Sequence, residues 1–231
     1  MRRLTFLDND SKFGRLCTLL GTIIVANLMF IVTLIPVITA GAGFCALYYT
    51  MLRLVRYKEI NPFSDFFHAF VSNFKQATLA WAAILAVAAF LAVEVRICSF
   101  LTGPLQYCVI AVYGAILALA LIAMYLFPVM ASFAGSLKTQ LCNSVCFIGK
   151  NIGFAFAIAL VNVIPMLATY MNLQMLPLAA FLWCMGGFAF FALVNSITFM
   201  RLFDPYLEPL EPEIDEADQR RILEEMRRLE G

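Results

Sequence analysis

Residues 27–58 read NLMFIVTLIPVITAGAGFCALYYTMLRLVRYK, an apolar run that is interrupted once and ends in basic residues. Pro36 ends a first apolar helix, the small residues of 39–43 form a short loop, and a second apolar helix continues to Lys58. We expect this stretch to form a helical hairpin in a lipid bilayer. A re-entrant second segment is the alternative, because the run after Pro36 is short for a full crossing.

The composition extends this interpretation to most of the chain. Of the 231 residues, 63% are hydrophobic and 13% are charged, whereas a soluble domain is about 45–50% apolar and about 25% charged. Spans are predicted at about 16–35, 38–57, 78–95, 105–130, 151–170 and 175–200, and several of these apolar runs are clearly long enough to cross a bilayer. We predict an all-α, polytopic membrane domain over 1–206 with about six transmembrane helices, followed by a cytoplasmic acidic and amphipathic tail over 207–231.

Two further segments are typical of amphipathic helices that lie in the plane of the membrane. In 62–76 the apolar residues recur at helical spacing and share one face: Phe63, Phe66, Phe67, Phe70, Val71 and Phe74. In 134–149 the expected apolar stripe consists of Leu137, Leu141, Val145 and Ile148, with Lys138, Gln140 and Asn143 as polar residues.

The basic residues predict the orientation of the chain. Six crossings place every basic cluster on one side of the membrane and leave only Arg96 on the other. The positive-inside rule makes the basic side cytoplasmic, so both termini are expected inside the cell. A cleaved signal peptide, with cleavage near the TAGA of 39–42, is disfavoured because the first apolar run is longer than a signal sequence requires.

Some residues of the predicted spans and their turns are candidates for buried polar contacts or hinges. Asparagines within a span most often form hydrogen bonds between helices, and together with Tyr48 they are also the side chains with which a path for a neutral solute would be lined. The candidate buried polar or hinge residues are Asn27, Pro36, Gly41, Gly43, Tyr48, Asn162 and Asn195.

Asp65, His68 and Lys75 are candidates for contact with a protein partner, because they lie on the polar side of the first amphipathic helix. Asp65 and His68 are three residues apart, but two ligands are too few for a metal site, and a solvated face is the favoured interpretation. None of the seven cysteines forms a CxxC pair, which argues against zinc and a disulfide framework. Cys98 and Cys108, which flank an outer loop, are the one disulfide considered. We predict no metal and no cofactor.

The sequence also argues against catalysis. The one histidine, His68, lies in FFHAF rather than in the HExxH of a metalloprotease. No serine is paired with a histidine or lysine at the depth of a span, and no aspartate cluster suits lipid phosphotransfer. The basic residues follow the membrane edge, so no nucleic-acid partner is expected. We predict that the protein is not an enzyme and that it has no catalytic residues.

Five stretches resemble the YesL-like family of bacterial membrane proteins, a domain-of-unknown-function group. They are PVITAGAGFCALYYTMLRLVR (36–56), FSDFFHAFVSNFKQA (63–77), YLFPVMASF (125–133), LCNSVCFIGKN (141–151) and NSITFMRLFDPY (195–206). The resemblance implies a multi-pass protein of the bacterial cytoplasmic membrane, encoded near genes for carbohydrate uptake and degradation. It supplies no functional residue.

Two functional hypotheses follow. The first is a non-enzymatic accessory component of carbohydrate uptake or sensing, in contact with the lipid bilayer and with a carbohydrate transporter or membrane signalling protein. The second is a small-solute transporter or channel. It is motivated by the proline-broken hairpin and by a weak repeat, in which an amphipathic helix is followed by two spans at 63–130 and again at 134–200.

Overall fold

The computed structural model of the chain describes residues 12–58, 60–100, 103–171, 174 and 176–207. The arm predicted at 1–11 and the tail predicted over 208–231 lie outside the described residues.

The described chain is built from helices and contains no strand. The elements, in order, are α1 (Lys12–Leu34), the 3₁₀ turn η2 (Val37–Thr39), α2 (Ala40–Tyr57), α3 (Pro62–Phe100), η3 (Gly103–Tyr107), α4 (Cys108–Ser132), α5 (Leu137–Lys150), α6 (Ile152–Met171), α7 (Leu176–Leu182), the π-helical turn η5 (Trp183–Gly187), α8 (Phe188–Phe203) and η6 (Asp204–Tyr206).

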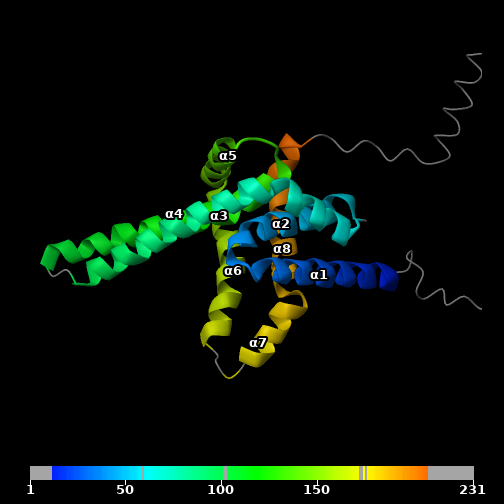
Figure 1. Cartoon of the computed structure of the whole chain (residues 1–231), viewed down its shortest axis with the longest axis horizontal. Helices are drawn as coiled ribbons and strands as arrows, with labels where there is room; N and C mark the ends of the chain where they lie inside the picture. The colour runs from blue at the N-terminus through cyan, green and yellow to red at the C-terminus, as the bar shows by residue number, and fades with distance from the viewer. Residues whose placement is uncertain (1–11, 59, 101–102, 172–173, 175, 208–231) are drawn as a thin grey trace, which may run out of the picture.

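Six helical segments are long and apolar enough to cross a membrane, with α7, η5 and α8 forming the last one. The fold is therefore that of an all-α, multi-pass membrane protein, as predicted. Helices α3 and α4 form a long hairpin that α6 and α8 cross steeply (Figure 1).

Helix α2 is the centre of the bundle. In its most apolar 18 residues 67% are buried, against 28% or less in each of the other five segments. It packs against α1, α3, α4 and α8, so its side chains meet protein rather than lipid. Helix α2 is continuous from Ala40 to Tyr57.

The small residues at 39–43 are not the loop that the sequence predicts. The chain reverses over Ile35–Thr39, where the Thr39 hydroxyl lies 2.6 Å from the carbonyl oxygen of Thr33, and Gly41 and Gly43 already belong to the first turns of α2. A Cβ atom at Gly41 would overlap Trp81 and the backbone of α3, and one at Gly43 would overlap Thr33. Both glycines therefore permit close helix packing.

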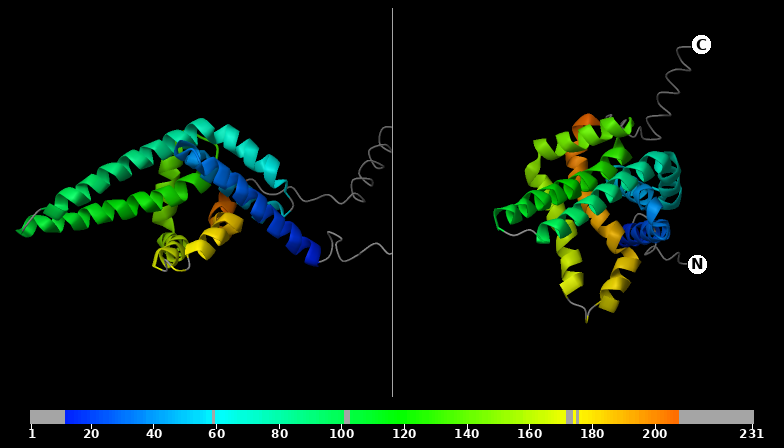
Figure 2. Two further views of the ribbon diagram at one scale, coloured as in Figure 1. Left: turned by 60° about the horizontal axis from the view of Figure 1, so that its bottom comes forward. Right: turned by 60° about the vertical axis from the view of Figure 1, so that its left-hand side comes forward.

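The predicted break between an in-plane helix at 62–76 and a span at 78–95 is also absent. Helix α3 is continuous over 39 residues, which is about 58 Å at 1.5 Å per residue and nearly twice the hydrocarbon thickness of a bilayer. Figure 2 shows that α3 changes direction along its length, so its first turns are inclined to the remainder. A bend within one helix takes the place of the expected junction.

Helix α5 turns part of its predicted apolar stripe outward. Leu141 and Val145 of the predicted apolar stripe are exposed, whereas Gln140, Ser144 and Phe147 are buried. The amide nitrogen of Gln140 donates to the carbonyl oxygen of Phe133 and thereby fixes the α4–α5 connection. The helix lies across the start of α6 (Figure 2) and turns apolar side chains away from the bundle, as a helix at a membrane surface does.

Candidate functional site

One cavity of the described bundle lies beside α2 and has a volume of about 240 Å³. Helices α2, α3, α4, α6 and α8 and the π-helical turn η5 line it, and it is partly open at the surface of the bundle. Its lining is Phe44, Leu47, Tyr48, Trp81, Ala123, Met124, Phe127, Asn162, Met166, Trp183, Phe188, Phe191 and Ala192. This set contains no Asp, Glu, Lys, Arg, His or Cys, so the cavity suits a neutral ligand.

Three of the predicted polar residues meet at one end of this cavity. The Asn195 amide nitrogen (α8) donates to the Tyr48 hydroxyl (α2) over 3.3 Å and to the Asn162 side-chain oxygen (α6) over 3.1 Å. The Asn162 amide nitrogen also donates to the carbonyl oxygen of Ile158 over 2.7 Å. Three helices that are distant in sequence are thus joined by neutral hydrogen bonds inside the membrane domain.

The pattern of donors leaves hydrogen-bonding capacity at the cavity wall. The Tyr48 hydroxyl accepts from Asn195, so its own proton is not used in that contact. The Asn162 amide group carries two N–H donors, and one of them is engaged by Ile158. Both residues line the cavity. The polar end can therefore donate to an oxygen atom of a bound molecule.

The position of this polar end is costly for the fold. Tyr48 lies eight residues from the start of α2, about 12 Å along the helix axis, and is therefore near the middle of the span. Polar groups at such depth are expensive unless they are hydrogen-bonded, and they are commonly functional.

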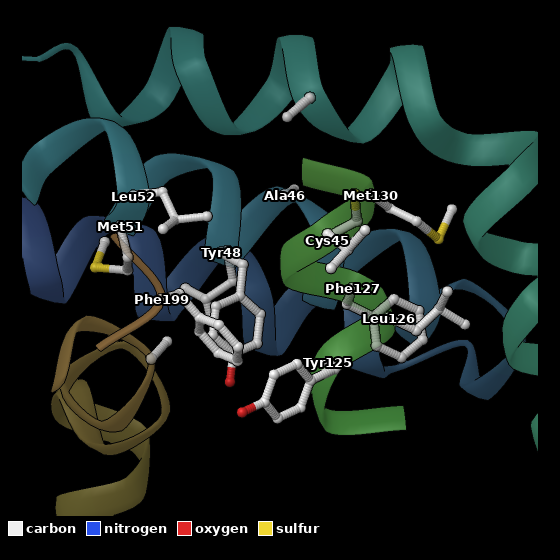
Figure 3. Packing of buried hydrophobic residues seen from close by; sticks show 14 of the residues in the cluster. Cys45, Ala46, Tyr48, Met51, Leu52, Tyr125, Leu126, Phe127, Met130 and Phe199 are labelled. Atoms are coloured by element: carbon white, nitrogen blue, oxygen red, sulfur yellow. The ribbon is translucent and has the colours of Figure 1, made fainter. Parts of the chain in front are cut away.

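Two additional hydroxyl groups extend the polar character of this region. Tyr125 (α4) and Ser196 (α8) are both 0% exposed, and neither hydroxyl has a hydrogen-bond partner among the described residues. The rings of Tyr48 and Tyr125 pack edge-on against Phe199, with centroids 6.0 Å and 5.0 Å from it. Figure 3 shows that the hydroxyl groups of Tyr48 and Tyr125 are directed to the same side of the bundle. The sequence analysis did not single out Tyr125 or Ser196, because a tyrosine or serine in an apolar run carries no motif.

Aromatic rings form most of the remaining wall. Both tryptophans of the chain line the cavity. The Trp81 indole nitrogen donates to the carbonyl oxygen of Val37 over 2.9 Å, and that of Trp183 donates to the Thr169 hydroxyl over 3.2 Å. Trp183 packs on Phe188 with ring centroids 4.8 Å apart. Hydrogen bonds therefore fix the orientation of both tryptophan side chains in the cavity wall.

Asn27 is buried outside this cavity and has a different partner. Its amide nitrogen lies 3.0 Å and 2.8 Å from the carbonyl oxygens of Trp183 and Cys184, and its side-chain oxygen accepts from the Ala189 backbone N–H over 3.0 Å. These backbone groups belong to the π-helical turn η5 and the start of α8. Asn27 thus stabilises an irregular turn that positions Trp183 in the cavity wall.

The other predicted residues lie away from the polar end. Pro36 is exposed at the α1–α2 turn, and Gly41 contributes indirectly because it admits Trp81. His68 and Lys75 are exposed. Asp65 is not on a solvated face: its side chain is 12% exposed and forms an ion pair with Arg53 over 2.6 Å.

The described part of the chain contains neither a cluster of potential metal ligands nor a disulfide bond. No three His, Cys, Asp or Glu side chains come together there as potential metal ligands. Cys98 is buried and Cys108 is exposed, and both are free thiols.

Comparison with known proteins finds one family that matches part of the chain, and no activity is assigned to that family. The model of a family described as "Protein of unknown function, DUF624" matches residues 23–95. The match covers part of α1, all of α2 and most of α3, and it includes two of the five stretches quoted above. Over this region the chain is similar to a domain of unknown function. No curated protein and no solved structure matches the chain.

Proposed function

We propose that this protein is a non-enzymatic accessory component of carbohydrate uptake or sensing, which binds a small neutral molecule inside its membrane domain. We place it in the bacterial cytoplasmic membrane with its basic end and both termini in the cytoplasm. The observation that carries the proposal is the cavity beside α2, where an aromatic wall faces two neutral hydrogen-bond donors, Tyr48 and Asn162.

The chemistry of the lining selects the class of ligand. A pocket with mostly apolar walls and a few placed polar groups orients its ligand through those groups. Sugars and glycosides have oxygen atoms that accept hydrogen bonds and C–H faces that pack on aromatic rings. The lining contains no charged group to bind an ionic solute, and it contains no histidine or carboxylate to act as a general acid or base.

Ligand binding can be measured with the native tryptophans, because Trp81 and Trp183 both line the cavity. The full chain in lipid nanodiscs is titrated with neutral monosaccharides, disaccharides and methyl glycosides while tryptophan fluorescence is recorded. We expect a saturable change that Asn162→Leu abolishes. Asn73→Leu is the matched control, since Asn73 also donates to the carbonyl oxygen four residues earlier in its own helix, over 3.1 Å. No saturable change with any of these compounds would refute the proposal, as would equal loss in both variants.

A protein partner is the second part of the proposal. The exposed His68 and Lys75 on the N-terminal part of α3 offer a polar surface to a carbohydrate transporter or membrane signalling protein. Crosslinking of the tagged chain in native membranes, followed by mass spectrometry, should recover such a partner. Recovery of self-crosslinks alone would count against the accessory role.

One observation favours transport as the alternative. The last span is interrupted by the π-helical turn Trp183–Gly187 beside the cavity, and broken or irregular helices often line the substrate sites of transporters. Flux of a neutral sugar into liposomes that contain the protein, reduced by Asn162→Leu, would favour this alternative. Binding without flux would favour the accessory role.

A further inference from the structure

The cavity beside α2 lies at the depth of the hydrocarbon core of the membrane. Tyr48 is about 12 Å along the axis from the start of α2, and Asn162 is about 15 Å from the start of α6, a helix of 20 residues. The hydrocarbon core of a bilayer is about 30 Å thick. Both polar residues of the cavity wall are therefore near the middle of their spans, far from water on either side.

The cavity is open on the side of α6. Met166 lines it and is 61% exposed, whereas the other described lining residues are buried or half-buried. Met166 lies one turn after Asn162 and shares its face of the helix. The exposed neighbours of Met166 on α6 are large and apolar: Val163, Ile164 and Leu167. A surface of this kind within a span faces lipid, so the opening leads into the bilayer.

Helix α6 covers the cavity loosely beyond its midpoint. Its buried residues, Ala155 and Ile158, both lie in its first half. Pro165 has no backbone N–H, so the helical hydrogen bond that would start there is missing. Farther along, the Trp183 indole nitrogen donates to the Thr169 hydroxyl and ties α6 to the last span. The second half of α6 is therefore the part of the wall that can move aside for a molecule from the bilayer.

The size of the cavity indicates that part of a ligand lies outside it. Its volume of about 240 Å³ is below the range of about 300–1,000 Å³ for pockets that bury most of a drug-sized ligand. The part outside meets lipid chains, where a polar group without a partner is costly and a CH₂ group is stabilised. A molecule with a polar end and a hydrocarbon chain suits both environments.

We propose that the glycoside bound beside α2 is an amphiphile, with its sugar ring in the cavity and its hydrocarbon chain passing Met166 into the bilayer. The ligand enters and leaves through the lipid, between α4 and the second half of α6. This inference rests on the proposed function and specifies its class of ligand. A free sugar is poorly soluble in hydrocarbon, so we expect it to bind more weakly than an alkyl glycoside with the same ring.

The first test is a chain-length series. Methyl, butyl and hexyl β-D-glucoside are titrated into nanodiscs that contain the full chain, and tryptophan fluorescence is recorded. Nanodiscs with Asn162→Leu correct for partition into the lipid. We expect the Kd, referred to the aqueous concentration, to fall about fourfold for each added CH₂ group, and we expect hexanol to give no saturable change.

The outcomes of this series separate the two proposals. Saturable binding with the same Kd for methyl and hexyl glucoside would overturn the amphiphile but leave the proposed function intact, because the chain would then gain nothing from lipid. A saturable change with hexanol alone would overturn the sugar ring as the group in the cavity. The absence of a saturable change with every glucoside would refute the proposed function itself.

The second test locates the chain and needs no variant. A hexyl glucoside with a diazirine at the end of its chain is photolysed in nanodiscs, and the labelled residues are identified by mass spectrometry. We expect labelling at Met166 that excess octyl glucoside suppresses and octanol does not. Met171 is 83% exposed on the same helix but does not line the cavity, so it reports background labelling. Equal suppression at Met166 and Met171, or suppression at neither, would overturn the proposal.

Discussion

Replacement of Asn27 by leucine tests whether the hydrogen bonds to the π-helical turn hold the last span in place. The Asn27 side chain is 0% exposed and makes three contacts with backbone groups of Trp183, Cys184 and Ala189. Leucine has the same number of side-chain heavy atoms and a similar branched shape but offers no polar atom, so the variant leaves these backbone groups without their partner.

The expected cost follows from the number of contacts. Hydrogen bonds between membrane helices contribute about 0.6 kcal/mol on average and up to about 1.7 kcal/mol, and a buried group that loses its partner costs about 1–3 kcal/mol. We expect Asn27→Leu to lower the free energy of unfolding by about 2–4 kcal/mol. This corresponds to about a 30-fold to 1,000-fold shift of the unfolding equilibrium.

The free energy can be measured by titration with sodium dodecyl sulfate in mixed micelles, followed by circular dichroism and tryptophan fluorescence. Trp183 reports locally on the π-helical turn. Asn73→Leu is the same substitution at a partly exposed residue of α3 and should change the free energy by less than about 0.5 kcal/mol. A loss below that value for Asn27→Leu would refute the reasoning, because the π-helical turn would then be stable without the hydrogen bonds from Asn27.

Three other predictions concern packing, topology and burial. Gly41→Ala should lower the free energy of unfolding by about 1–3 kcal/mol because its Cβ atom would overlap α3, whereas Gly114→Ala, with open space around it, should be neutral or stabilising. In intact cells an impermeant maleimide should label a single cysteine at Cys108 but not one at Cys142, and the reverse result would invert the predicted orientation. Gln140→Leu should change the free energy of unfolding by less than about 1 kcal/mol in thermal melts, because it loses the bond to the Phe133 carbonyl in the α4–α5 connection but also removes a buried oxygen without a partner. A large loss of unfolding free energy would show that the bond to Phe133 outweighs the cost of the unpartnered oxygen.

The apolar runs predicted the class of fold correctly, but they could not predict which side of a helix faces the protein. Lipid tails are as apolar as a leucine side chain, so the stripe of Leu141 and Val145 faces outward in α5 while Gln140 faces inward. In a membrane domain the buried face is better indicated by polar and small residues than by leucine. The same reason explains the error at Gly41, which belongs to a close helix contact and not to a loop.

The candidate site was predictable only in part. Tyr48, Asn162 and Asn195 were singled out because polarity inside a span is costly, and the structure brings these three together. Their convergence depends on helices that are distant in sequence, which one sequence does not reveal. The π-helical turn that Asn27 holds has no sequence signal beyond a pair of glycines, Gly186 and Gly187, because its extra residue is stabilised by a contact from another helix.

The central position of α2 has a consequence for biosynthesis. It is the least apolar of the six spans and the most shielded from lipid, so it gains less than the others from entering the bilayer alone. The partner of its Tyr48, Asn195, is synthesised 147 residues later, which takes about 7 to 30 seconds at ordinary elongation rates. During that interval the future core of the protein has neither its last helix nor its polar contacts. Membrane insertion of this chain therefore precedes its folding by many seconds, a period in which α2 depends on its neighbour α1 and on whatever accompanies the nascent chain.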